Sequence, residues 1–289
     1  MLSYSPIERA KPLLGTTVSI RLSGLGPVQA HGAIDAAFAE VAQIHALMSF
    51  HDDCSDVSRL NRDAHIVPIA VDERTYRVIA RALAISEISD GAFDISVAPA
   101  LVTRGLLPRP RQAPVPDAQA SWRDIELQPD LKIRFRKPLW IDLGGIAKGF
   151  AVDRATAILS KQSPCLTTVN AGGDLRVAGG CETIRLAAPQ GDGVPVVQLT
   201  DGSLASSCGR MLGRRVAMPG AQPHVEARQR LRALPEQFVS VTAPLCIDAD
   251  ALTKVVMAKG VRARLALIAC NARAVVHDAL FGWRELGSA

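Results

Sequence analysis

Aromatic side chains are scarce in this sequence and make up 4% of its 289 residues. A surface that binds nucleic acid by stacking bases on aromatic rings is therefore not expected. Six cysteines are present, but no pair is spaced as C-x-x-C and none stands beside a histidine at zinc-finger spacing. Their pattern indicates free thiols in a reducing compartment rather than a disulfide framework.

Several common motifs are missing as well. The histidines form no H-x-x-H or H-E-x-x-H pattern, which argues against a zinc hydrolase. Neither a Walker A loop nor G-x-G-x-x-G occurs, so standard nucleotide-binding folds are not supported. No apolar run approaches the roughly 18 residues of a transmembrane helix, and the N-terminus lacks the pattern of a signal peptide. We expect a cytoplasmic protein, or a periplasmic one if a leader has been removed.

The composition that remains is that of a globular protein. Hydrophobic residues make up 48% of the chain and charged residues 21%. A chain of this length can bury a sizeable core without disulfides or metals. The formal net charge is +5, with the lysines and arginines scattered along the chain. This surplus is consistent either with a solvated basic surface or with a phosphate-rich ligand.

The spacing of apolar residues predicts four main helices. They are expected at 28–48, at 73–89 with Gly91 as a C-cap, in a segment that follows two glycines and ends near 159, and at 250–259.

Strands are predicted in clusters between these helices. Because they do not alternate steadily with helices, the fold class is predicted to be α+β, with residues 1–289 as one domain. Two polar, irregular segments, 49–62 and 104–121, are predicted to be loops. The predicted strands are 14–22, 124–127, 131–135, 139–143, 168–170, 175–177, further strands within 184–203, and 238–243, and the segments 263–268 and 273–276 close the chain.

Two glycine-rich turns can bring the backbone close to an anion. In Asp142-Leu-Gly-Gly-Ile-Ala-Lys148, a short strand ends in a carboxylate, two glycines turn the chain, and a helix begins. Free N–H groups at such a helix start, with Lys148 in the first turn, suit a phosphate. In Asn170-Ala-Gly-Gly-Asp174, two glycines between strands allow positive φ or close approach. An ordinary strand-to-helix turn and an ordinary bulged hairpin remain open as alternatives.

Two further segments carry candidate ligands. In residues 248–254, Asp250 is expected at a helix N-terminus. There it would act as an N-cap or, with the hydroxyl of Thr253 on the same helix face, present hard oxygens to Mg²⁺. In residues 90–96, Phe93 can cover a flat ring or pack in the core.

Taken in order, these segments resemble the FAD:protein FMN transferases, the ApbE family, over nearly the whole chain. Agreement in several ordered motifs is more specific than any one of them. The matching pieces are Leu14-Gly-Thr16, Ser55-Asp-Val-Ser-Arg-Leu-Asn61, Gly91-Ala-Phe-Asp94, Asp142-Leu-Gly-Gly-Ile-Ala-Lys-Gly149, Asn170-Ala-Gly-Gly-Asp174 and Asp250-Ala-Leu.

The resemblance implies an ApbE-like, T-fold-like arrangement of mixed sheets with packed helices. It also implies an enzyme that splits FAD, transfers FMN to a Thr or Ser of an acceptor protein, and releases AMP. FAD would be the substrate, Mg²⁺ the metal, and an acceptor flavoprotein subunit with a flavinylation motif the partner. The implied flavin-binding residues are Leu14, His51, Ala92, Phe93, Asp94, Asp142, Lys148, Gly172, Gly173 and Asp174.

The implied metal site departs from the family pattern. Its ligands would be Gly145, Asp250 and residues three and four beyond Asp250. The family usually has a threonine four residues on, where this chain has Lys254, with Thr253 one place earlier. We hypothesise that Thr253 supplies the oxygen instead. A competing hypothesis is that the ammonium of Lys254 partly replaces the metal.

A second departure concerns the catalytic base. The family usually carries a histidine, a candidate base, after a Thr-Ser-Gly stretch, and Arg215 falls at that position here. His224 is nearby in sequence and is the candidate catalytic residue. An active FMN transferase is the leading interpretation. The alternative is a catalytically impaired FAD-binding protein that serves as a flavin carrier or assembly factor. A basic nucleic-acid-binding protein is a distant third, because no reading motif is present.

Overall fold

The computed structural model describes residues 4–161, 165–186, 195–209, 225–226, 231–232, 238–278 and 282–286. Within these ranges the largest sheet has eight strands, and every neighbouring pair is antiparallel. In order across the sheet, the strands are β1 (Ile7–Leu13), β2 (Thr16–Ser23), β6 (Leu166–Ala171), β7 (Asp174–Ala178), β10 (Ser203–Cys208), β13 (Phe238–Ala243), β14 (Arg273–Asp278) and β15 (Gly282–Leu286).

Three helices cover this sheet: α1 (Pro27–Met48), α5 (Ala147–Leu159) and α6 (Cys246–Lys259). Helix α5 packs against β6 and β7, α6 packs against β10 and β13, and α1 packs against α5. Glycine is required where α5 meets α6, because a Cβ atom at Gly149 would lie 2.2 Å from the carbonyl oxygen of Cys246. The close approach of these two helices positions the residues of the candidate site.

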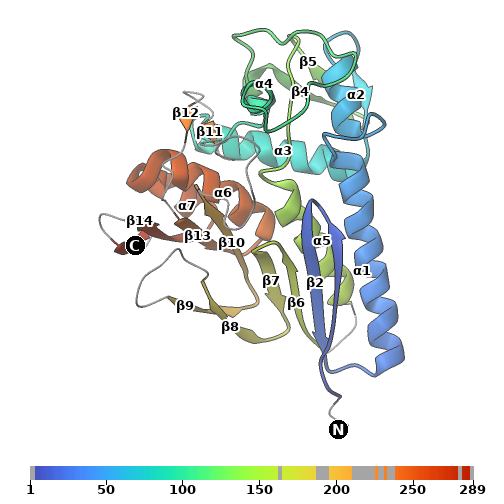
Figure 1. The fold of residues 1–289 in the computed structure, drawn as a ribbon, viewed down its shortest axis with the longest axis vertical. Coiled ribbons are helices and arrows are strands. Elements are labelled where there is room, and N and C mark those ends of the chain that lie inside the picture. The colour runs from blue at the N-terminus through green and yellow to red at the C-terminus, as the bar shows by residue number, and fades with distance from the viewer. Residues whose placement is uncertain are drawn as a thin grey trace.

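A smaller lobe sits beyond one end of the sheet (Figure 1). Its three-stranded sheet has the order β3-β5-β4, with helices around it. The elements are α2 (Asp56–Asp63), β3 (Ile69–Ala70), α3 (Glu73–Ile88), η1 (Ile95–Val97), α4 (Ala98–Thr103), η2 (Trp122–Asp124), β4 (Ile125–Gln128) and β5 (Lys132–Phe135). The remaining described elements are β8 (Cys181–Arg185), β9 (Val196–Thr200), β11 (Val225–Glu226), β12 (Leu231–Arg232), η3 (Gly260–Ala263) and α7 (Arg264–Ala269).

Alternation along β7 separates two apolar clusters. Leu175 and Val177 belong to a smaller cluster with Leu186, Leu199, Leu204 and Phe238, next to the β8–β9 hairpin. Asp174 and Arg176 point the other way and bind side chains of α5. The larger cluster is formed by the helices, the central strands and the smaller lobe. Antiparallel sheets with helices packed on them confirm the α+β prediction.

Two predictions near the N-terminus need correction. The strand expected at 14–22 begins at Thr16, because Leu14 and Gly15 have φ values of 55° and 70° and form the two-residue turn of the β1–β2 hairpin. The segment 49–62, expected to be a loop, contains most of α2. Ser55 caps that helix by accepting a hydrogen bond of 3.0 Å from the N–H of Ser58.

The strand predicted at 139–143 is also wrong. This segment is mostly buried but joins no sheet. At Ile141 the backbone is bonded by the side chain of Asn61, which accepts from the N–H at 2.7 Å and donates to the carbonyl oxygen at 3.0 Å. A buried segment needs hydrogen bonds but not necessarily a neighbouring strand. None of the helices within the described ranges is both long and apolar enough to cross a lipid bilayer.

Candidate active site

A cavity of about 730 Å³ opens where the start of α5, the turn between β6 and β7, strand β10 and helix α6 meet. Such a volume is typical of a site for a small molecule or cofactor. The predicted site residues that line it are Ala92, Phe93, Asp94, Asp142, Gly145, Lys148, Gly172 and Gly173.

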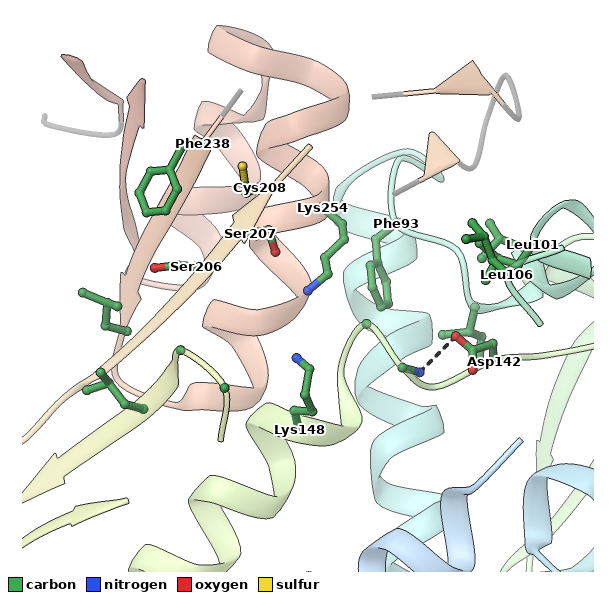
Figure 2. A pocket seen from close by; sticks show the side chains of 18 of the residues that line it. Phe93, Leu101, Leu106, Asp142, Lys148, Ser206, Ser207, Cys208, Phe238 and Lys254 are labelled. Carbon is green, nitrogen blue, oxygen red and sulfur yellow. Dashed lines mark hydrogen bonds between the residues drawn. The ribbon is translucent and has the colours of Figure 1, made fainter. Parts of the chain in front are cut away.

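The lining of this cavity has a charged middle and apolar flanks. Figure 2 shows the amino groups of Lys148 and Lys254 in the middle of the view, with Phe238 on one side and Leu101 and Leu106 on the other. Leu175, Ile184, Leu186 and Leu204 extend the apolar lining beside Phe238. The cavity therefore suits a ligand with an anionic centre and ring systems to either side.

The charged middle rests on two buried carboxylates. Lys148, in the first turn of α5, pairs with Asp174 on β7, and its Nζ lies 3.5 Å from Oδ2 of Asp250 on α6. Lys254 pairs with Asp250 from one helical turn away. The side chains of Asp174 and Asp250 are 2% and 0% exposed, so neither could stay ionised without these partners.

These pairings set the proton affinities of the cluster. Burial alone would lower the pKa of Lys148, but the carboxylates of Asp174 and Asp250 raise it, so the amine stays charged. Burial and the nearby Asp250 raise the pKa of Asp174. For Asp250 burial acts in the same direction, but Lys148 and Lys254 outweigh it and lower the pKa. Two ammonium groups and two carboxylates thus form a buried cluster close to neutrality.

The turn before α5 holds a third carboxylate. Asp142 accepts a hydrogen bond of 3.1 Å from the N–H of Gly144 (Figure 2), and its own N–H donates to the carbonyl oxygen of Ile95 at 2.8 Å. Burial raises the pKa of Asp142, while the hydrogen bond from Gly144 and the charge of His51 oppose the shift. The helix predicted after the two glycines is confirmed, with α5 beginning at Ala147, but the described residues just before the glycines form no strand.

The second predicted glycine turn is confirmed by its backbone angles. Gly172 and Gly173 have φ values of 67° and 103°. A Cβ atom at Gly172 would lie 2.5 Å from Oγ1 of Thr16, so glycine is needed there for space as well. Asn170 holds the turn by accepting a hydrogen bond of 2.8 Å from the N–H of Gly173. Both glycines line the cavity with no side chain of their own, which leaves room for a ligand.

Asp250 does not cap a helix, although its sequence pattern predicted a position at a helix N-terminus. Helix α6 begins at Cys246, so Asp250 lies one turn inside it. The cap comes from Asp153 on α5, whose carboxylate accepts hydrogen bonds of 2.9 Å from the N–H groups of both Cys246 and Ile247. Arg176 pairs with the same carboxylate. Asp250 instead accepts a hydrogen bond of 3.1 Å from the N–H of Gly149.

Some predicted site residues lie elsewhere. Leu14 forms the β1–β2 turn and does not line the cavity. His51 is exposed outside it, although its charge reaches Asp142. Thr253 is fully buried behind the lining, on α6. His224, the candidate base, and Arg215 lie outside the described residues.

The structure brings in residues that the sequence interpretation missed. Ser206 and Ser207 of β10 line the cavity, together with Phe238 of β13 and Arg185 of β8. The sequence of β10, Ser-Leu-Ala-Ser-Ser-Cys, has no apolar–polar alternation that would have identified a cavity-facing side. No sequence pattern identifies Arg185, because its hairpin reaches the cavity only through tertiary packing.

The geometry around Asp250 decides whether the predicted Mg²⁺ position is available. Its Oδ1 accepts from Lys254, and its Oδ2 accepts from the N–H of Gly149 and the amine of Lys148. The hydroxyl of Thr253 donates to the carbonyl oxygen of Asp250 at 2.7 Å and lies 2.8 Å from Oγ of Ser207. Within the described ranges, no three His, Cys, Asp or Glu side chains are grouped as metal ligands. The residues present therefore do not fit a divalent metal at Asp250 and Thr253.

The sequence is similar to those of several named proteins. The chain is 29% identical over 184 residues to a Haemophilus influenzae protein named FAD:protein FMN transferase, covering 57% of this chain and 52% of that protein. A Treponema pallidum protein of the same name is 26% identical over 186 residues, covering 60% and 51%. The chain thus spans about half the length of these curated relatives.

A solved structure agrees over a longer stretch. The ApbE protein of Thermotoga maritima superposes with a TM-score of 0.83 at 26% identity, covering 98% of this chain and 97% of that one. The model of the family described as the ApbE family matches residues 14–277. The glycine turns, Lys148 and Asp250 all lie inside this match, and the chain belongs to the ApbE family.

Proposed function

We propose that this protein is an FAD:protein FMN transferase, which moves FMN from FAD onto a Thr or Ser hydroxyl of an acceptor protein and releases AMP. The single observation that carries the proposal is the cavity with the ammonium groups of Lys148 and Lys254 in its middle and apolar flanks. FAD has matching chemistry, because an anionic pyrophosphate joins its flavin half to its adenosine half. Membership of the ApbE family and the names of the relatives support the same activity.

The proposed reaction is a phosphoryl-type transfer. The acceptor hydroxyl oxygen attacks the phosphorus of the FMN half and forms a new P–O bond. The bond from that phosphorus to the bridging oxygen breaks, and AMP leaves with the electron pair. The proton of the hydroxyl passes to a base, for which His224 is the candidate. Such reactions depend on positioning and on neutralising charge more than on covalent help from the protein.

Lys148 has the main electrostatic role in this scheme. It lies in the first turn of α5, and its ammonium faces the cavity. Asp174 and Asp250 keep it charged and hold it in place. A fixed positive charge at this point would bind the pyrophosphate and stabilise the charge that develops on the leaving AMP. The scheme gives no step to Mg²⁺, because the groups around Asp250 do not fit one.

The backbone and the apolar lining would position the two halves of FAD. Gly172 and Gly173 let the β6–β7 turn approach the phosphates without a side chain between them. Phe93, which is 6% exposed, both packs in the core and lines the cavity, where it can cover a flat ring. Closing this apolar surface over the ligand would exclude water, so that a protein hydroxyl rather than water accepts FMN.

The test is incubation of the purified protein with FAD and an acceptor that carries a flavinylation motif. Release of AMP together with an acceptor mass increase equal to FMN is the expected result. The control is an acceptor whose motif Thr or Ser is replaced by alanine. FAD binding with no AMP after several acceptors would refute the transferase. It would favour the catalytically impaired FAD carrier or assembly factor, for which the engaged carboxylate of Asp250 is the structural argument.

A further inference from the structure

The side chain of Lys254 occupies the space in front of Asp250 that a cation would need. Its Nζ donates to the carboxylate of Asp250 and, at 3.0 Å, to the main-chain carbonyl oxygen of the same residue. Two oxygens of one residue, one charged and one neutral, thus converge on a single ammonium. Hard oxygens of these kinds are also the usual ligands of Mg²⁺.

The stem of Lys254 crosses the other predicted ligand position. A Cβ atom at Gly145 would lie 3.6 Å from Cε of Lys254, so the lysine passes directly over this glycine. Lys254, whose side chain is 17% exposed, lines the cavity, whereas Asp250 behind it is 0% exposed. Any ion that reached Asp250 from the cavity would have to displace the ammonium.

The charge balance of the cluster also argues against a divalent metal at Asp250. Asp174 and Asp250 carry two negative charges, and Lys148 and Lys254 carry two positive ones. Before FAD binds, a divalent cation added to this buried cluster would meet two ammonium groups, and the cluster has no excess negative charge to offset it. Without Lys254 the same cluster would have one negative charge in excess, and the oxygens of Asp250 would be open to a metal.

We infer that the ammonium of Lys254 is the built-in cation of this site and takes the place of a divalent metal ion at Asp250. The inference rests on the proposed function, because it assigns the charge that faces the pyrophosphate in the same cavity. Lys254 would act with Lys148 as a pair of fixed positive charges on the two sides of the phosphates. The site would then bind FAD with no need for metal, and chelators would leave FAD binding unchanged.

The test measures metal binding itself, on the full chain without acceptor. Mn²⁺ is titrated into chelator-treated protein, with and without FAD, and free Mn²⁺ is followed by electron paramagnetic resonance. We expect no binding by the wild type below millimolar Mn²⁺. Lys254→Thr should bind at least about tenfold more tightly, because it removes the ammonium and leaves the carboxylate exposed. Adding Asp250→Asn to Lys254→Thr should abolish the gain.

Two further variants show whether the gain is specific to the position of Lys254. Lys259→Thr removes the same charge from the last turn of α6, outside the cavity lining, and should bind Mn²⁺ like the wild type. If Lys254→Thr does not fold, Lys254→Met removes the ammonium with a side chain of similar length. Micromolar binding of Mn²⁺ by the wild type, or no gain in either Lys254 variant, would overturn the inference. Both outcomes are read without turnover, so they are independent of whether FMN is transferred.

Discussion

The carboxylate of Asp153 on α5 accepts a hydrogen bond of 2.9 Å from the backbone N–H of Cys246, the first residue of α6. The side chain of one helix thus caps the next helix from 93 positions earlier in the chain. Helix α6 carries Asp250 and Lys254, so this cap fixes where both stand relative to Lys148 on α5. The charged middle of the cavity depends on this junction.

Asp153→Ala should therefore destabilise the protein and weaken FAD binding together. Two N–H groups of α6 lose a charged acceptor and Arg176 loses its partner, which should cost about 2–4 kcal/mol of unfolding free energy. Asp153→Asn keeps one acceptor oxygen and should cost about half as much. Urea denaturation and FAD titration measure the two effects. An alanine variant as stable as the wild type would contradict the role of this cap.

Lys148→Met should abolish FAD cleavage and weaken FAD binding, because it removes a fixed charge from the middle of the cavity. It also leaves Asp174 and Asp250, 2% and 0% exposed, short of a partner. Losing one member of a buried pair costs about 3–5 kcal/mol. Adding Asp174→Asn should restore part of this stability but none of the activity. Lys161→Met, at an exposed position just beyond the end of α5, is the control and should change neither.

Gly172→Ala should be more damaging than Gly173→Ala, although both positions have positive φ. At Gly172 the new Cβ would meet Oγ1 of Thr16 at 2.5 Å, whereas at Gly173 it meets nothing within 4 Å. Gly173→Ala should cost about 1 kcal/mol from backbone strain, and Gly172→Ala about 1–3 kcal/mol more. Thr16→Ala should relieve most of the clash, leaving the Cβ atom of residue 16 at 3.1 Å, but not the backbone strain. Equal melting temperatures for the two glycine variants would contradict this distinction.

Glu40 on α1 should contribute a pH-dependent part of the stability. The hydrogen bond from Arg74 holds the pKa of Glu40 below its ordinary value against the effect of burial, and Arg154 adds to the shift. A lowered pKa in the folded state stabilises the protein above the unfolded pKa of about 4.3, and this stabilisation is lost as the pH falls through the folded pKa.

The matching experiment compares the wild type with Glu40→Gln by urea denaturation from pH 7 to pH 3. The variant should be less stable by about 1 kcal/mol at pH 7, a modest value because Arg74 and Arg154 are 30% and 38% exposed and solvent screens the pairs. The difference should shrink below about pH 4.3. A difference that stays constant over this range would argue against the ion pairs as its cause.

Much of the site could be predicted because its turns are encoded locally. Two glycines in a row at 144–145 and at 172–173 leave few alternatives to a tight turn, and the chain turns at both places. Lys148 could be predicted as a site residue because it lies in the first turn of the helix that follows the glycines. Leu14 and His51, which were assigned by family position alone, do not line the cavity. Nothing in their local sequence indicates which way a turn or an exposed loop faces.

The sequence by itself determined the main helices, most of the antiparallel strands and the glycine turns, because apolar periodicity and backbone freedom act over a few neighbouring residues. The tertiary structure alone decided that Asp153 caps α6, that Asn61 takes the place of a neighbouring strand for 139–143, and that Lys254 covers Asp250 from the cavity side. Two of these partners are far apart in the chain. Lys254 is only four residues from Asp250, but it can cover that carboxylate only because Gly145 leaves space for its side chain. Buried polar groups must find partners wherever packing offers them, and packing is a property of the whole chain.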